Sequence, residues 1–381
     1  MKGLPYFPVS ALLTIVTAAD SSILSISLNQ ATKGASISQQ AHHAAARRHG
    51  GYALAPETLD GGFWYGSFDV GEAMNVSLLI DTGSSDVSIN PDLYQPSLAS
   101  LDLHQNGTLG YSTVQENGCG FANISYHTYA DTVSFAGLTA RNQTFAAVIA
   151  KPPPDNGTIT QFPHQGIVGF SSTHANTTQL DAIPLFQTLC NQHTVRECKF
   201  GLALGTDGNG TQVLGGTDHQ LFDGDLITVD ADPNEEYAFD GSITADGSVA
   251  LTSDRIIPDS GTANVIGPIS DVQKLFDILG IQAVQQNLPG CTSVLFGYYP
   301  CDAPPKVGFT IGNSTKSFDI ESSAFQQADN GNNNCTAIVT GIDLSTRHPL
   351  WIIGQAWFQG KYVDFDPANS KLGVAPLKAD C

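Results

Sequence analysis

Two aspartates are the residues best placed to carry out chemistry, because each ends an apolar run and is followed at once by a hydroxyl residue and a glycine. The two segments are Leu78-Leu79-Ile80-Asp81-Thr82-Gly83-Ser84 and Ile256-Ile257-Pro258-Asp259-Ser260-Gly261-Thr262. A strand that ends in a carboxylate and a tight turn presents that carboxylate on a shaped loop, where backbone amides and hydroxyls can hold it. Two such loops facing each other would form a carboxylate pair, which can share a proton and act as an acid and a base.

Each aspartate has a later companion, an apolar pair followed by glycine. The companions are Gly166-Ile167-Val168-Gly169 and Trp351-Ile352-Ile353-Gly354, and both lie roughly 90 residues after their aspartate. Taken singly, Asp-Thr-Gly and Asp-Ser-Gly are ordinary turn sequences. The matched flanks and companions indicate an internal duplication, in which a pseudo-twofold axis relates two lobes and brings the aspartates together.

The composition describes an acidic chain that is long enough for two lobes with separate cores. Its 381 residues include 16 Lys and Arg against 36 Asp and Glu, which gives a net charge of −20 at pH 7. Such a charge argues against nucleic acid or an anionic membrane surface as a partner. Because self-repulsion eases as carboxylates protonate, we expect the protein to prefer mildly acidic surroundings.

The N-terminus is typical of a secreted precursor. Lys2, the apolar stretch from Ala11 to Val16 and the small residues after it predict a signal peptide over residues 1–19. The polar stretch that follows ends in Arg47-Arg48 and predicts a propeptide over residues 20–48, with an uncut linker as the alternative. The C-terminus lacks the hydrophobic tail of a lipid-anchor signal. We therefore expect a secreted protein, or one delivered to a vacuole or another acidic compartment, with no membrane anchor.

Sequons and cysteines agree with a secretory route. Sequons that predict surface glycosylation occur at Asn75, Asn106, Asn123, Asn142, Asn156, Asn176, Asn209, Asn313 and Asn334. Seven cysteines predict disulfides with at least one cysteine left over. Cys190 and Cys198 are close enough to close a small loop, and Cys301 and Cys335 could link two strands, whereas spacing does not assign Cys119, Cys291 and Cys381. No cysteine belongs to a Cys-x-x-Cys or Cys/His pattern, so we expect no zinc site.

Short runs typical of β-strands recur at intervals of about 10 residues. They cover residues 63–70, 76–80, 132–135, 144–150, 200–204, 212–215, 226–230, 307–311 and 361–365. Helical spacing is confined to short pieces, at 269–279, which stops at Gly280, and at 185–189. This pattern predicts an all-β fold with minor helices. A composition break near Gly215 to Gly224 places an N-terminal lobe at residues 49–222 and a C-terminal lobe at residues 223–381.

At these residues the chain resembles the pepsin-like aspartic proteases, whose two β-rich lobes each contribute one aspartate to a cleft between them. The resemblance spans roughly Phe63 to Lys378 and includes, beyond the aspartate loops, Gln165 to Phe170, Val213 to Asp218, Trp351 to Gly354, Val363 to Asp366 and Leu372 to Pro376. It implies a secreted aspartic endopeptidase, made as a zymogen, that hydrolyses peptide bonds of polypeptide substrates at acid pH. It also implies a monomer without metal or cofactor, and a disulfide between Cys301 and Cys335.

The resemblance assigns roles residue by residue. It makes Asp81 and Asp259 the catalytic dyad, in which one aspartate takes a proton from a water held between them and the other, protonated, polarises the scissile carbonyl. The supporting groups would be Ser84 and Thr262 at the outer carboxylate oxygens, and the amides of Gly83 and Gly261 at the inner ones.

The first-lobe flap is the main departure from the family pattern. The family usually has a tyrosine near the tip of this hairpin and a tryptophan shortly after the first aspartate, where this chain has Ser88. A hairpin that turns at Asn117-Gly118 has a strong turn signal and would lack that tyrosine. The alternative register uses Tyr126 and leaves the hairpin too short. We therefore expect a flap without its usual tyrosine–tryptophan contact.

The second half of the chain departs from the family pattern at two further positions. Pro258 removes a strand donor directly before the second aspartate, and Gln355 replaces a residue that is acidic in many relatives, which should change the pH of optimal activity. The departures at Ser88, Asn117 and Pro258 leave open a protease-like binding protein that does not cleave efficiently, although binding alone would not require both aspartates. A carbohydrate-cleaving enzyme is the third interpretation, and it needs carboxyl groups several ångströms apart rather than in contact.

Overall fold

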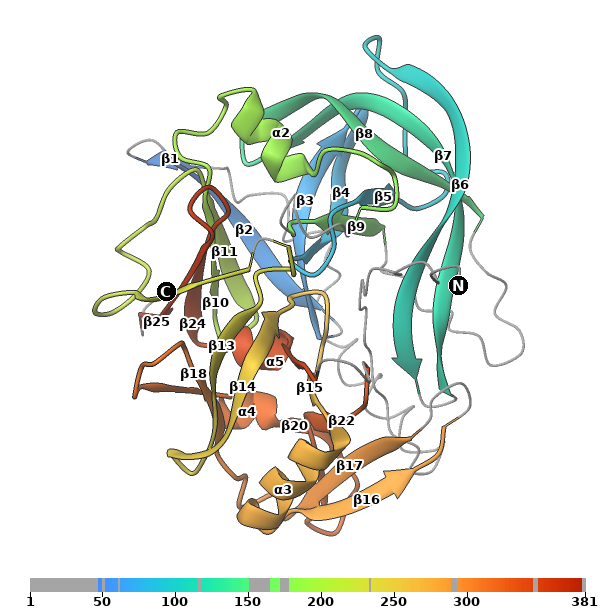
Figure 1. Ribbon diagram of the computed structural model, residues 1–381. Coiled ribbons are helices and arrows are strands. Elements are labelled where there is room, and N and C mark those ends of the chain that lie inside the picture. The colour runs from blue at the N-terminus through green and yellow to red at the C-terminus, as the bar shows by residue number, and fades with distance from the viewer. Residues whose placement is uncertain are drawn as a thin grey trace, which may run out of the picture.

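The computed structural model describes residues 47–49, 52–60, 62–115, 118–150, 165–171, 178–232, 234–288, 293–344 and 349–378. Strands dominate these residues and form two large sheets, one mainly in the upper and one in the lower part of the molecule in Figure 1. The predicted all-β, two-lobed fold with minor helices is confirmed. The predicted signal peptide and the predicted propeptide up to residue 46 lie outside the described residues.

The first sheet has 14 strands among the described residues. Its order is β12-β25-β24-β10-β11-β2-β3-β4-β9-β5-β8-β7-β6, with β1 paired to β2. The strands are β1 (Arg47–His49), β2 (Tyr52–Asp60), β3 (Phe63–Val70), β4 (Ala73–Asp81), β5 (Val87–Ile89), β6 (Leu101–Gln115), β7 (Gly118–Phe135), β8 (Leu138–Ala150), β9 (Gly166–Gly169), β10 (Phe200–Leu204), β11 (Asn209–Leu214), β12 (Ile227–Asp230), β24 (Lys361–Asp366) and β25 (Lys371–Pro376).

The second sheet has 11 strands within the described ranges, in the order β19-β18-β13-β14-β23-β15-β22-β17-β21-β20, with β16 paired to β17. They are β13 (Phe239–Ala245), β14 (Ser248–Pro258), β15 (Val265–Gly267), β16 (Gln282–Gln286), β17 (Val294–Tyr299), β18 (Val307–Thr310), β19 (Ser317–Asp319), β20 (Gln326–Asp329), β21 (Cys335–Ala337), β22 (Val339–Gly341) and β23 (Trp351–Ile353).

The helices are short, as the sequence predicted. They are α2 (Leu185–Asn191), α3 (Ile269–Leu279), α4 (Ser322–Phe325) and α5 (Gln355–Phe358). Helix α3 has the predicted bounds because Val272, Leu275 and Phe276 are buried on one face and Gly280, at φ 68°, takes the left-handed conformation that ends the helix. Within the described ranges, no helix combines the length and the apolar character needed to cross a membrane.

The two lobes repeat one pattern of strand pairing, as the internal duplication predicted. In the first lobe β4 pairs in parallel with β9, β9 pairs antiparallel with β5, and β5 pairs in parallel with β8. In the second lobe β14 pairs in parallel with β23, β23 antiparallel with β15, and β15 in parallel with β22. The strands that lead to the two aspartates, β4 and β14, therefore occupy equivalent places.

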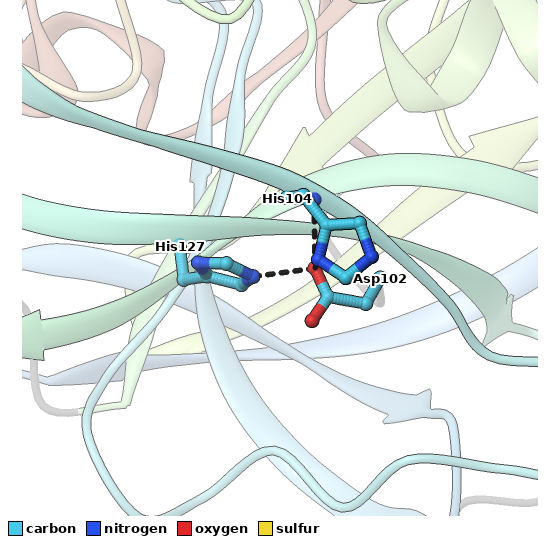
Figure 2. A group of neighbouring side chains, drawn as sticks. All are labelled: Asp102, His104 and His127. Atoms are coloured by element: carbon cyan, nitrogen blue, oxygen red, sulfur yellow. Dashed lines mark hydrogen bonds and ion pairs between the residues drawn. The ribbon is translucent and has the colours of Figure 1, made fainter.

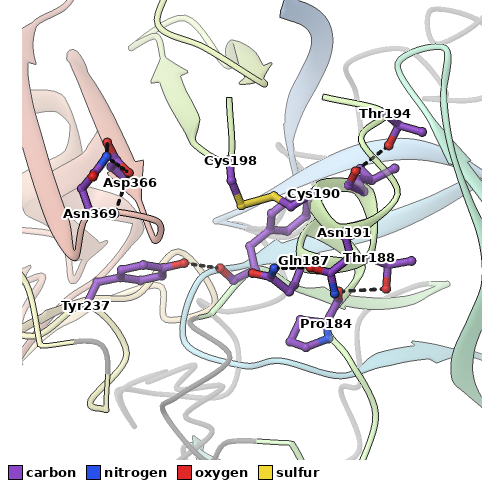
Figure 3. Close-up of a disulfide and its surroundings, with 12 residues drawn as sticks. Pro184, Gln187, Thr188, Cys190, Asn191, Thr194, Cys198, Tyr237, Asp366 and Asn369 are labelled. Carbon is purple, nitrogen blue, oxygen red and sulfur yellow. Dashed lines mark hydrogen bonds between the residues drawn. A yellow bond between two sulfur atoms is a disulfide. The ribbon is translucent and has the colours of Figure 1, made fainter. Parts of the chain in front are cut away.

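The C-terminal strands tie the lobes together. Strands β24 and β25 come from the end of the chain, yet β24 pairs with β10 of the first sheet, beside β11 in Figure 1. The predicted lobe boundary at residue 222 stays a prediction. Both disulfides considered from the sequence are formed: Cys190–Cys198 beside α2, shown in Figure 3, and Cys301–Cys335 in the second lobe. Cys291 and Cys381 lie outside the described residues.

Candidate active site

The two aspartates occupy equivalent positions at the ends of buried strands. Asp81 is the last residue of β4 and Asp259 directly follows β14. The adjoining companion strands hold both backbones, since the Phe170 amide donates to the Asp81 carbonyl at 2.7 Å and the Asp259 amide donates to the Ile353 carbonyl at 3.1 Å. Each aspartate is 2% exposed. Apolar strands β4, β9, β14 and β23 thus bring two carboxyl groups into the interior from both lobes.

Each carboxyl group is held by the same two donors of its own loop. The Gly83 amide donates to Asp81 Oδ1 at 2.9 Å, and the Ser84 hydroxyl donates to Oδ2 at 2.5 Å. In the second loop the Gly261 amide donates to Asp259 Oδ1 at 2.8 Å and the Thr262 hydroxyl to Oδ2 at 2.6 Å. These are the contacts expected from the sequence, and they fix both carboxyl planes in matching orientations.

The carboxyl groups meet across the lobe interface. A Cβ atom on Gly83 would come within 2.6 Å of Asp259 Cγ, and one on Gly261 would overlap the Asp81 carboxyl, so only glycine permits this approach. The two carboxyl groups therefore lie against each other, and each changes the pKa of the other. Because two carboxyl groups in contact cannot both ionise cheaply, the pair holds one proton in common. This contact excludes the wider separation, about 5 Å or more, that glycosidases need.

Burial determines the protonation of the pair. It raises the pKa of Asp81, while hydrogen bonds from Ser84, from Asp259 and from the backbone oppose the rise. Burial and the negative charge of Asp81 together raise the pKa of Asp259 well above its usual range. Since only one member of such a pair ionises readily, the two behave as one acid and one base.

A set of crossed hydrogen bonds between the loops was not anticipated from the sequence. The Thr82 amide donates to Ser260 Oγ at 3.0 Å, and the Ser260 amide donates to Thr82 Oγ1 at 2.9 Å. The hydroxyls in turn donate to strand carbonyls of the opposite lobe, Thr82 to Pro258 at 2.8 Å and Ser260 to Ile80 at 2.7 Å. The signal was present, since both aspartates are followed by a hydroxyl residue.

The departures from the family pattern at Pro258 and Gln355 fit the structure. Pro258 ends β14 opposite Ile353, and its carbonyl is the acceptor for Thr82. Gln355 is buried, and its side-chain amide donates to the Ser260 carbonyl at 2.6 Å, a bond that an ionised carboxylate could not make. Ser88 is fully buried in β5, between β8 and β9.

The flap candidates lie on the hairpin of β6 and β7. Gln115 of β6 pairs with Gly118 of β7. Residues 116 and 117, which include Asn117, lie outside the described residues. Gly118 is the first residue of β7. Tyr126 lies eight residues further along β7, paired with Gly107 and buried, and so away from the end of the hairpin.

A third carboxyl group near the pair was also missed. Glu236 is 8% exposed, and it lies on a loop where it and Tyr237 have left-handed backbone conformations, with φ of 47° and 61°. The hydroxyl of Tyr237, which is labelled in Figure 3, donates to the Phe170 carbonyl at 3.2 Å, and the Phe170 amide donates to the Asp81 carbonyl. Burial raises the pKa of Glu236 to about 8, with Arg255 opposing the shift and the negative charges of Asp81 and Glu235 adding to it. No periodic pattern marks this residue in the sequence.

Comparisons with known proteins agree with this geometry. The family model described as eukaryotic aspartyl protease matches residues 63–377. The chain is similar to cathepsin E of Aquarana catesbeiana, with 27% identity over 82% of this chain and 79% of the relative. It is also similar to pepsin A of Sus scrofa, with 28% identity over 82% and 81%, and to secreted aspartyl protease 1 of Malassezia globosa, with 25% identity over 83% and 74%. With its two equivalent lobes and its matched aspartate loops, the chain belongs to the eukaryotic aspartyl protease family, the pepsin-like aspartic endopeptidases.

Proposed function

We propose that this protein is an endopeptidase that cleaves polypeptides at acid pH with Asp81 and Asp259 as its catalytic pair. The observation that carries the proposal is the proton-sharing contact between two buried carboxyl groups held by matching donors. A binding protein with the same fold would have no need of this contact, because burying two acids against each other is costly.

The pair supplies both proton transfers of peptide hydrolysis. Asp81, ionised, takes a proton from a water molecule as that water attacks the scissile carbonyl carbon. Asp259, protonated, donates its proton to the carbonyl oxygen, so that a neutral tetrahedral diol forms. Asp81 then gives its proton to the leaving nitrogen, the C–N bond breaks, and the proton of one new hydroxyl returns to Asp259. Donation from Ser84 and Gly83 stabilises the Asp81 carboxylate before the first step and after the last.

The same proposal includes activity at acid pH and secretion of the protein. The reaction requires a single proton on the pair, and a second proton blocks the base at very low pH while loss of the shared proton removes the acid at high pH. The net charge of −20 and the secreted relative from Malassezia globosa support release into an acidic exterior.

Substitution of either aspartate tests the proposal. Asp81→Asn or Asp259→Asn should lower cleavage of a denatured protein at roughly pH 3 to 5 by at least about a thousandfold. Asp92→Asn, at an exposed aspartate, is the matched control and should cleave like the unchanged protein. Equal proteolysis by all three variants would show that the pair is not catalytic, and no proteolysis even by the unchanged protein would favour a binding protein.

A further inference from the structure

A second cluster of titratable side chains lies on the β6–β7 hairpin. Figure 2 shows Asp102, His104 and His127 converging from the two paired strands. The register shifts here, because Asp102 pairs with Tyr129 whereas Asn106 pairs with His127, so β6 contains a bulge of extra residues. His104 lies in this bulge with a left-handed φ of 55°. The bulge therefore brings the imidazole of His104 next to the carboxylate of Asp102 and the imidazole of His127.

The donor atoms converge on one point. His104 Nδ1 lies 3.2 Å and His127 Nε2 2.5 Å from Asp102 Oδ1. All three atoms lie within 4.8 Å of one another. In a tetrahedral zinc site, metal–ligand distances of about 2.0–2.1 Å place neighbouring ligand atoms about 3.3 Å apart. The His104 contact already has this spacing, and the His127 contact needs to open by less than about 1 Å.

The arrangement also contains the outer contacts that orient metal ligands. His127 Nδ1 lies 2.6 Å from Asn106 Oδ1, a contact that holds the ring with Nε2 directed toward Asp102. Tyr129 packs edge-on against the His127 ring, with centroids 5.0 Å apart, and limits its rotation. The His104 amide donates to Asp102 Oδ1 at 2.7 Å and fixes the carboxylate.

The charge and exposure of the cluster favour metal entry. Among the described residues, the ion pairs of Asp102 are those with His104 and His127, and neither lysine nor arginine competes for the carboxylate. The side chain of His104 is 83% exposed, which leaves the site open to solvent. The net charge of −20 raises the local concentration of cations.

We propose that Asp102, His104 and His127 bind a divalent transition-metal ion such as Zn²⁺, with Asn106 orienting His127 from outside. Two imidazoles and one carboxylate leave a fourth position to water, which is the donor set that zinc accepts. The bound ion would join β6 to β7 at the bulge and so fix the root of the long hairpin, which runs down the right side of Figure 1. The proposal is independent of peptide hydrolysis, because none of these residues contacts the aspartate loops in the described structure.

Metal titration of the full chain tests the proposal. The chelator-treated protein at pH 7 should bind a single Zn²⁺ in competition with a chromophoric chelator, and Co²⁺ should give the visible absorption of a tetrahedral site. His127→Gln and His104→Gln should each weaken binding at least tenfold, about 1.4 kcal/mol, and abolish the cobalt spectrum. His219→Gln, at an exposed histidine outside the cluster, should bind like the unchanged protein. Because His104 is so exposed, its variant remains informative if His127→Gln does not fold.

A second pair of variants distinguishes the effect of the Asn106–His127 contact on metal binding from any effect of glycosylation at Asn106. Asn106 belongs to the sequon Asn106-Gly107-Thr108, so Asn106→Ala removes both the His127 contact and any glycan. Thr108→Ala removes only the sequon. Asn106→Ala should weaken metal binding about tenfold and Thr108→Ala should leave it unchanged. Unchanged zinc affinity in both histidine variants, or the absence of saturable binding by the unchanged protein, would overturn the proposal.

Discussion

Thr82 and Ser260 join the two aspartate loops through hydroxyls that both accept and donate across the lobe interface. Each accepts from the amide of the other and donates to a strand carbonyl of the opposite lobe. Both residues are fully buried, so no water can replace a lost partner. A shift of either loop would leave several polar groups unpaired. These hydroxyls therefore set the relative position of the two carboxyl groups.

Removal of either hydroxyl should cost more stability than an ordinary surface hydrogen bond. Thr82→Val and Ser260→Ala each leave one buried amide and one buried carbonyl without a partner, so each should lower the free energy of unfolding by about 1–3 kcal/mol. Thr139→Val removes a half-buried hydroxyl that bonds Ser134 and should cost less than about 1 kcal/mol. Urea unfolding measures all three. A cost for Thr82→Val no larger than that for Thr139→Val would contradict the interlobe role.

Local motifs predict those site residues that act within one loop. Asp81, Gly83 and Ser84 lie in one short segment, and their contacts follow from turn chemistry. Glu236 and Asp86 could not be found in this way, since their environments come from distant segments. Asp86, for example, is buried and accepts from the amide of Gln179 at 2.6 Å and the hydroxyl of Thr178 at 2.7 Å.

At the scale of elements, strands with an apolar sequence were predicted well, whereas strands with a polar sequence were not predicted. Strands β3 and β10 have the predicted bounds because they are almost wholly buried. Strand β6 was not predicted and β7 only at its end, because the hairpin they form is rich in Asn, Gly, Ser and Thr and lacks the alternation of a half-buried strand. Strands β16 and β20, which are rich in Gln, were not predicted either, because they too are polar. The cluster of Asp102, His104 and His127 depends on the length of this hairpin and on its bulge, whereas the sequence predicted only a turn at Asn117-Gly118.

The two disulfides should differ in what they contribute to stability. Cys190 and Cys198 are separated by 8 residues, whereas Cys301 and Cys335 are separated by 34. In the chain-entropy model the longer loop restricts the unfolded chain more, so it should contribute about 4 kcal/mol against about 2.5 kcal/mol for the shorter one. The double variants Cys190→Ala/Cys198→Ala and Cys301→Ala/Cys335→Ala, compared by urea unfolding, measure the difference. A larger loss on removing the 190–198 bond would contradict the loop-length argument.

At the scale of the whole molecule, the sequence predicted the duplicated strand pairing around β4 and β14. It did not predict that the C-terminal strands would join the first sheet. Strand β24 pairs with β10 although about 160 residues separate them along the chain, and β25 pairs in turn with β24. The sequence does not show which strand of the first sheet β24 would pair with. The same long-range packing buries acids that the composition presents as ordinary surface charge. Glu57, on β2, is 3% exposed, and its carboxyl oxygens have no hydrogen-bond partner among the described residues.

Stability should therefore fall as the pH rises from about 5 to about 8. Burial raises the pKa of Glu57 and of Glu236 to about 8, whereas an unfolded glutamate titrates near about 4.3. Between these values the native state keeps protons that the unfolded state has released, so each carboxyl lowers the free energy of unfolding by about 1.4 kcal/mol per pH unit. Urea unfolding at about pH 5, 6.5 and 8 measures this slope. Glu57→Gln, which does not titrate, should reduce the slope by about 1.4 kcal/mol per pH unit, and Glu72→Gln, at an exposed site, should leave it unchanged. A free energy of unfolding that is constant or rises over this range would show that Glu57 and Glu236 are ionised in the native protein.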